Sequence, residues 1–343
     1  MFQKKNLLSL VIIVTLILVG FLIYLKPKPP VAQIQTSWKQ TLFQTKNLDA
    51  KIQAIIKIVD TKDPLAALNE LNSQMKTDKE IFKNCHGIAH EIGHRAYDKY
   101  KNFAEAMKYQ NVVCSDGYLH GVIEQRFFYA KNPEAILSDM KTVCDGVKES
   151  GRCYHGVGHG LMYYFANDLP KVLDVCDKYK NAAQGRCYEG AFMENFLSDA
   201  VIHPSVYLDS KNSLYPCPTE LSRYKSYCYF YAPIYYLSLH SNDYAAALEW
   251  CTTAEKVGVP ECIRGVGSLA MKYNIDQPKA VEAICNRAKN KQQTSSCIDG
   301  MVSYYLTFYD HLSKAIDMCA TMELKNQPAC NAAVDRRSKL FLN

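Results

Sequence analysis

A cysteine-led segment recurs along most of this chain and limits its fold more than any other feature. In most copies a glycine follows two or three positions after the cysteine, and apolar or aromatic residues come next. The leading cysteines are Cys85, Cys114, Cys153, Cys187, Cys228, Cys262, Cys297 and Cys330. Steps of about 30 to 40 residues are typical of arrays in which each unit buries its apolar face against its neighbours. The sequence therefore predicts a repeat protein.

Between these segments lie shorter amphipathic stretches that each end in a second cysteine. They end at Cys176, Cys251, Cys285 and Cys319, and Ala, Leu and Val recur in them at steps of three and four residues. This spacing places the apolar side chains on one face of a helix. We therefore expect each unit to consist of a helix, a turn and a second helix, which makes the fold class all-α.

The small residues of the first helices carry a resemblance to a known architecture. They are Gly87, Gly117, Gly156, Gly190, Gly265 and Gly300. A helix–turn–helix unit of about 34 residues, with a small residue where its helices touch, resembles the tetratricopeptide repeat. The chain is also similar to the cysteine-rich bacterial variants of that repeat, which bridge their helices with disulfides, although the usual Trp and Pro signature positions are not met. The resemblance covers residues 80–320, approximately, and implies a right-handed helix–turn–helix solenoid.

The cysteines themselves fall into regularly spaced pairs. These are Cys144/Cys153, Cys176/Cys187, Cys217/Cys228, Cys251/Cys262, Cys285/Cys297 and Cys319/Cys330. Each pair joins the end of one second helix to the start of the next first helix, and such regular spacing predicts disulfides. Closing loops this short is worth about 2–3 kcal/mol each in the chain-entropy model. Cys85 and Cys114 remain and are expected to form a seventh bridge. Zinc-binding thiolates are the alternative, but no C-x-x-C occurs in the sequence.

An uncharged apolar segment of nineteen residues, 7–25, precedes the repeats. As a helix it would be roughly 28 Å long, close to the thickness of a bilayer core. A cleaved signal peptide is the alternative, but its apolar region is typically shorter and ends at a small-residue site. We therefore expect a short tail (1–6), a transmembrane anchor (7–25), a stalk (26–45) and a repeat domain (46–343).

Cysteine usage and charge restrict the compartment and the partners. All fourteen cysteines follow the apolar segment, and regularly paired cysteines fit an oxidising compartment. The repeat domain is therefore expected outside the cytoplasm, held at the cell membrane by a single helix. The formal net charge is +6, and four lysines that flank the apolar segment account for +4 of it. Nothing in this balance favours nucleic acid as a partner.

Six of the nine histidines lie between residues 86 and 159, and with nearby carboxylates they occupy similar positions on four successive first helices. The candidate metal ligands are His86, His90, His94, Asp116, His120, His155, His159 and Glu189. Residues four apart lie on one helix face, and helices packed about 8–10 Å apart would bring these faces together. Imidazoles and carboxylates at such spacing bind zinc or iron, so a mono- or dinuclear site is predicted. The helical-repeat deoxyhypusine hydroxylases, with a di-iron centre on successive inner helices, are an analogous arrangement.

A second interpretation uses an overlapping motif. Residues 90–94 read H-E-I-G-H, which matches the H-E-x-x-H pattern of zinc peptidases, with two histidine ligands and a glutamate as general base. Glu124 would then be a candidate third ligand. The other repeat copies lack the motif, which favours the first interpretation. Glu91, and Glu194 on the fourth first helix, are the candidate catalytic residues.

The sequence therefore predicts a membrane-anchored, extracytoplasmic metalloprotein that is a hydrolase or an oxidase, if it is an enzyme. An alternative of another class is a non-enzymatic scaffold that binds a protein or peptide in a tyrosine-rich groove, as helical repeat arrays commonly do. The later repeats hold Arg264, Ser268 and Ser303 in place of ligand-type side chains. The units from Cys228 onward are therefore expected to be structural or partner-binding.

Overall fold

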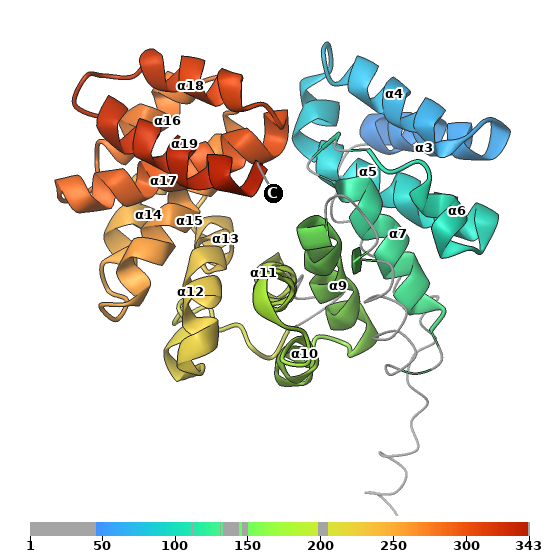
Figure 1. Ribbon diagram of the computed structural model, residues 1–343, viewed down its shortest axis with the longest axis horizontal. Helices are drawn as coiled ribbons and strands as arrows, with labels where there is room; N and C mark the ends of the chain where they lie inside the picture. The colour runs from blue at the N-terminus through green and yellow to red at the C-terminus, as the bar shows by residue number, and fades with distance from the viewer. Residues whose placement is uncertain are drawn as a thin grey trace, which may run out of the picture. The chain divides into compact units, whose positions relative to one another are not determined.

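The computed structural model describes residues 46–111, 113–114, 116–130, 132, 144–145, 150–197 and 205–341, all in the second of the two units of the chain, Phe43–Asn343 (Figure 1). These residues form helices and no strand, which confirms the predicted all-α class for this part of the chain. The predicted tail (1–6), anchor (7–25) and stalk (26–45) lie outside the described residues. Within the described ranges, no helix combines the length and the apolar character needed to cross a membrane.

Shorter helices separate most of the longer helices in the described part of the chain. The longer helices are α5 (Lys79–Tyr100), α7 (Gly117–Phe128), α9 (Ser150–Tyr164), α11 (Asn181–Leu197), α12 (Ser222–Tyr231), α15 (Gly258–Tyr273), α17 (Lys291–Tyr309) and α19 (Gln327–Phe341). The shorter ones are α6 (Phe103–Met107), α10 (Leu169–Cys176), α13 (Pro233–Leu239), α14 (Tyr244–Cys251), α16 (Pro278–Cys285), α18 (Leu312–Ala320) and the 3-10 helix η1 (Cys217–Thr219). Before the first cysteine-led segment, α3 (Lys46–Thr61) and α4 (Pro64–Gln74) pack against α5.

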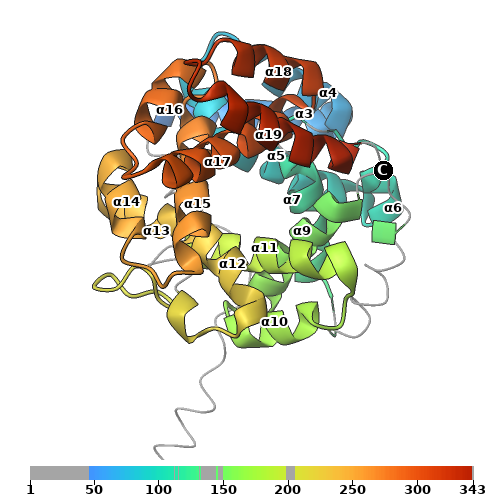
Figure 2. The same cartoon turned by 60° about the vertical axis from the view of Figure 1, so that its left-hand side comes forward.

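The longer helices pack against one another in chain order. α5 contacts α7, α7 contacts α9, α9 contacts α11, and α15 contacts both α12 and α17 (Figure 1). Figure 2 shows the short helices α10, α14, α16 and α18 on the outer side of this row. Leu173, Leu248 and Val281 of the short helices are buried in the apolar core that the two layers share. The face of the longer helices that points away from the short helices does not contribute to this core, so polar side chains can lie on it.

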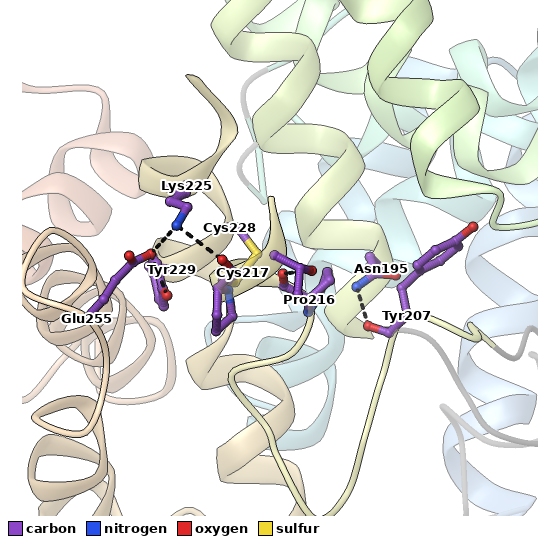
Figure 3. Close-up of a disulfide and its surroundings, with 10 residues drawn as sticks. Asn195, Tyr207, Pro216, Cys217, Lys225, Cys228, Tyr229 and Glu255 are labelled. Atoms are coloured by element: carbon purple, nitrogen blue, oxygen red, sulfur yellow. Dashed lines mark hydrogen bonds and ion pairs between the residues drawn. A yellow bond between two sulfur atoms is a disulfide. The ribbon is translucent and has the colours of Figure 1, made fainter. Parts of the chain in front are cut away.

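The six predicted cysteine pairs between successive helices are disulfides. They are Cys144–Cys153, Cys176–Cys187, Cys217–Cys228, Cys251–Cys262, Cys285–Cys297 and Cys319–Cys330. Figure 3 shows the bond that joins η1 to α12. Beside it, Lys225 forms an ion pair of 2.7 Å with Glu255, and Tyr229 donates a hydrogen bond of 2.9 Å to the same carboxylate (Figure 3). The disulfide and these polar contacts together hold α12 against its neighbours on both sides.

The predicted seventh bridge is not formed in this structure. Cys85 and Cys114 are buried free thiols. Cys114 lies before the first residue of α7, whereas Cys153, Cys187 and Cys262 lie inside the helices that they lead. No described short helix ending in a cysteine precedes either thiol, so both lack the helix-end partner that Cys187, Cys262, Cys297 and Cys330 have.

Closely packed glycines set the register between neighbouring long helices. A Cβ atom added to Gly121 of α7 would lie 2.0 Å from the backbone oxygen of His90 on α5. A Cβ atom added to Gly190 of α11 would likewise lie 2.0 Å from the backbone oxygen of His155 on α9. The prediction that Gly87 marks such a contact is wrong, because no described atom lies within 4 Å of a Cβ added there.

The closer contact aligns His90 with His155, one helical turn from the alignment of His86 with His155 that the glycine pattern suggested, while a Cβ atom added to Gly117 would lie 2.5 Å from the backbone oxygen of His86. The segment H-E-I-G-H at 90–94 therefore corresponds to H-G-V-G-H at 155–159. In both segments the glycine at the fourth position lies against the backbone of the next helix. The H-E-x-x-H match is thus one of two copies of an H-x-x-G-H pattern whose glycine has a packing role.

Contacts between residues far apart in the chain also join the later units to the earlier ones. Arg152 of α9 forms an ion pair with Asp116 at 2.7 Å and another with Asp310, directly after α17, at 3.0 Å. The rings of Phe82 on α5 and Phe308 on α17 have centroids 6.0 Å apart. The later units therefore support the helices that carry the histidines.

Candidate metal centre

Two histidines of α5 face each other through their ring nitrogens. The Nε2 atoms of His86 and His90 lie 3.1 Å apart. His86 Nδ1 donates a hydrogen bond of 2.7 Å to the backbone oxygen of Cys114, and His90 Nδ1 donates one of 3.1 Å to Oε2 of Glu124. A carbonyl or carboxylate oxygen only accepts, so each Nδ1 carries the hydrogen. Each ring, when neutral, therefore presents an Nε2 lone pair to the other.

A third ring completes this group from the neighbouring helix. His120 of α7 offers a ring nitrogen, and this atom and those of His86 and His90 all lie within 4.8 Å of one another. His120 is 4% exposed, and its Nδ1 has no hydrogen-bond partner among the described residues. A buried polar atom without a partner costs free energy, so a ligand for this nitrogen would stabilise the site.

The separation of the ring nitrogens fits a shared metal ion. Two lone pairs at 3.1 Å repel each other unless a proton or a cation lies between them. Zinc binds imidazole nitrogen at about 2.0–2.1 Å, which places two such ligands roughly 3.3 Å apart at a tetrahedral angle. A proton joins only two nitrogens, whereas His86, His90 and His120 present three. The donor set therefore fits a metal ion better than a shared proton.

A second histidine pair repeats this arrangement on α9. The Nε2 atoms of His155 and His159 are also 3.1 Å apart, and His159 Nδ1 donates a hydrogen bond of 2.7 Å to Glu194 of α11. Nδ1 of His155 lies 3.8 Å from Glu189. The ring centroid of His120 is 5.2 Å from that of His155 and 5.3 Å from that of His159. Five imidazoles from the three successive long helices α5, α7 and α9 thus form one cluster, with His120 between the two pairs.

Burial keeps several of these rings neutral. It lowers the pKa of His86 and of His120 well below the ordinary value, and the neighbouring histidines add to the effect. Burial likewise lowers the pKa of His155 to about 4, although Glu189 opposes it. A neutral imidazole has one free lone pair, which is the form that binds metal ions.

His94 has a different environment from the five clustered rings. Its Nε2 lies 2.7 Å from Oε2 of Glu124, and its Nδ1 lies 3.5 Å from Oε1 of Glu91. Burial alone would lower the pKa of His94, but the hydrogen bonds to Glu124 and Glu91 raise it to about 10. His94 is therefore held as a cation between two carboxylates.

Two predicted carboxylate ligands are paired with arginines. Asp116 is 2% exposed and forms its ion pair with Arg152. Glu189 lies 2.7 Å from Arg186, and although burial raises the pKa of Glu189, Arg186 brings it down to about 2. These ion pairs favour the five histidines as the principal donor set.

The structure adds roles that the sequence did not indicate. Glu124, suggested only as a third ligand of a zinc peptidase, accepts hydrogen bonds from both His90 and His94. Burial alone would raise the pKa of the Glu124 carboxyl. The two histidines outweigh this effect and hold the pKa well below its ordinary value. Burial raises the pKa of Tyr163, and the Glu194 carboxylate adds to this effect. Glu124 and Tyr163 each lie four residues after a clustered histidine, a spacing that could have identified both.

Comparison with protein-family models, with curated proteins and with solved structures finds no match to this chain. Imidazole nitrogens from successive helices, oriented through Nδ1 by carboxylates and a carbonyl, are typical of transition-metal sites.

Proposed function

We propose that this chain is an extracytoplasmic metalloprotein in which His86, His90 and His120 bind a divalent transition-metal ion, zinc or iron. The convergence of three ring nitrogens within 4.8 Å carries the proposal. A Cys114 carbonyl and the Glu124 carboxylate orient two of the rings from behind. Such outer partners fix the tautomer and the direction of a ligating imidazole.

The His155–His159 pair is the proposed second position of a dinuclear site. Its 3.1 Å separation and its carboxylate partner Glu194 reproduce the features of the first pair. His120 lies between the two histidine pairs, so its ring would be a neighbour of an ion bound at either pair. A bound ion would supply Lewis acidity at this cluster, which could serve hydrolytic or oxidative chemistry.

The glutamates near the cluster have distinct proposed roles. Glu194 contacts His159, and Glu91 contacts His94, so both remain candidates for moving a proton near the ion. The zinc-peptidase alternative needs His94 as a ligand, yet both of its ring nitrogens face carboxylates. The five-histidine cluster is therefore the better supported donor set.

The setting of the site is part of the proposal. The six disulfides fit an oxidising compartment. We propose that residues 7–25 anchor the chain in the cell membrane with the repeats outside the cytoplasm. The alternating long and short helices support a right-handed solenoid of helix pairs.

Metal analysis of the purified full chain tests this proposal. After removal of adventitious metal and reconstitution with zinc or ferrous iron, we expect one or two tightly bound ions per chain. His86→Ala, His90→Ala and His120→Ala should each lower the affinity more than about 10-fold, since loss of a ligand should exceed the effect of losing an outer partner.

His311→Ala is the matched control, because this histidine precedes α18 and makes no capping hydrogen bond through its side chain. It should bind metal as the unaltered chain does. Circular dichroism of each variant separates loss of a ligand from loss of folding. A folded chain that binds no metal would refute the proposal and leave the protein- or peptide-binding scaffold as the better interpretation.

A further inference from the structure

Helices α15 and α17 pack in the same register as α9 and α11. A Cβ atom added to Gly300 of α17 would lie 1.8 Å from the backbone oxygen of Arg264 on α15. Gly190 of α11 makes the equivalent close approach to the backbone oxygen of His155 on α9. Arg264 therefore has the position in its helix pair that His155 has in the histidine cluster. This equivalence places Arg264 on the face of the long helices that carries the histidines.

Three guanidinium groups gather around one carboxylate on this face. Oδ1 of Asp299 on α17 lies 2.8 Å from Arg336 Nη2, and Oδ2 lies 3.6 Å from Arg337 Nη2 on the same helix, α19. Arg264 Nη1 lies 4.0 Å from Asp299, and Arg264 Nη2 forms an ion pair of 2.5 Å with Glu261. Among the described residues, no other carboxylate lies within 4.0 Å of these arginines. Three positive charges thus share two negative ones.

Arg264 retains a donor that the protein does not use. Its Nε atom is buried and has no hydrogen-bond partner among the described residues. Its Cζ atom lies 4.6 Å from the centroid of the Phe230 ring, which covers one side of the guanidinium. A buried donor without a partner costs free energy, so an acceptor bound at this guanidinium would stabilise the site.

Arg337 is a second cation whose charge is poorly compensated. Its side chain is 22% exposed, and its distance to Asp299 exceeds that of a hydrogen bond. Burial lowers the pKa of Arg337 and the nearby Arg264 adds to this effect, although Asp299 opposes it. A guanidinium keeps its charge in proteins, and a buried charge is costly unless it is paired. A ligand anion would supply the missing partner.

We propose that Arg264, Arg336 and Arg337 form an anion-binding site that takes a carboxylate or phosphate group of a ligand. Arginine presents its N–H donors in a planar fork that fits the oxygen atoms of either group. Asp299 would keep the three side chains together before the ligand binds. The inference goes beyond the proposed metal centre, because an anion at these arginines requires no metal ion.

Titration of the metal-free full chain with inorganic phosphate tests this site. A chelator removes any ion that could hold phosphate at the histidines, and calorimetry at constant ionic strength measures the affinity. We expect saturable binding that Arg264→Gln and Arg337→Gln each weaken by about 10-fold or more, because each change removes hydrogen bonds between charged groups. Arg337→Lys keeps the charge but not the fork, so its affinity should be intermediate. A parallel titration with acetate shows which of the two groups the site prefers.

Arg223→Gln is the matched control, because its guanidinium is paired with Asp177 at 2.6 Å. It should bind phosphate as the unaltered chain does, and circular dichroism checks that every variant is folded. Absence of saturable phosphate binding, or equal affinity of folded Arg264→Gln and Arg337→Gln with the unaltered chain, would overturn the inference and leave the metal centre intact. A chain that binds phosphate through these arginines but holds no metal would support the inference and refute the metal centre.

Discussion

The backbone oxygen of His90 lies against Gly121 so closely that a Cβ atom at position 121 would come within 2.0 Å of it. His90 therefore both packs α5 against α7 and presents a ring nitrogen to the proposed metal centre. Helix packing and ligand position are coupled at this point.

This contact predicts that Gly121→Ala separates α5 from α7. We expect a loss of about 1–3 kcal/mol of stability, as for other overpacked contacts, together with weaker metal binding. Gly87→Ala is the control, since the space around it is open, and alanine should stabilise the helix by up to about 1 kcal/mol. Denaturant unfolding of both variants measures the difference. Equal stability of the two would contradict the assigned register.

The orientation of His90 should depend on the Glu124 carboxylate. Glu124→Gln keeps the shape of the side chain but removes the charge-assisted acceptor at 3.1 Å from His90 Nδ1. Metal affinity should fall about 10–100-fold, measured by calorimetric titration of the folded chain. Glu255→Gln, far along the chain beside the Cys217–Cys228 bond (Figure 3), is the control and should leave the affinity unchanged.

His94 and His86 should respond differently to replacement by glutamine. His86→Gln removes a proposed ligand, so bound metal should fall more than about 10-fold. His94→Gln should leave metal binding in place, because both nitrogens of that ring are directed at carboxylates. Elemental analysis of the folded variants gives the answer. The opposite pattern would support the H-E-x-x-H zinc site.

The disulfides of the later units should contribute to stability and not to metal binding. Removing the Cys251–Cys262 bond by a double change to alanine opens a loop of 11 residues, which costs about 2–3 kcal/mol in the chain-entropy model. Thermal unfolding measures the loss. The folded variant should hold as much metal as the unaltered chain, and a reduced metal content would show that these units take part in the site.

The helices and the six disulfides were predictable because they depend on short-range patterns. Apolar residues at steps of three and four select the buried face of a helix, and cysteines such as Cys176 and Cys187 mark the two ends of one tight connection. The grouping of His86 with His90, and of His155 with His159, is equally local. Residues four apart on a helix are neighbours whatever the tertiary structure is.

The sequence alone thus determined the helical class, the six bridges between successive helices and the histidine pairs. Tertiary packing decided which groups the histidines meet, because contacts between residues about 30 apart depend on the rotation and register of each helix. A glycine permits close approach, but which carbonyl it meets is set by the neighbouring helix, so Gly121 and not Gly87 makes the contact. The same rotation brought Glu124 to His90 and placed Asp116 opposite Arg152, since a buried charge takes the partner that packing makes available.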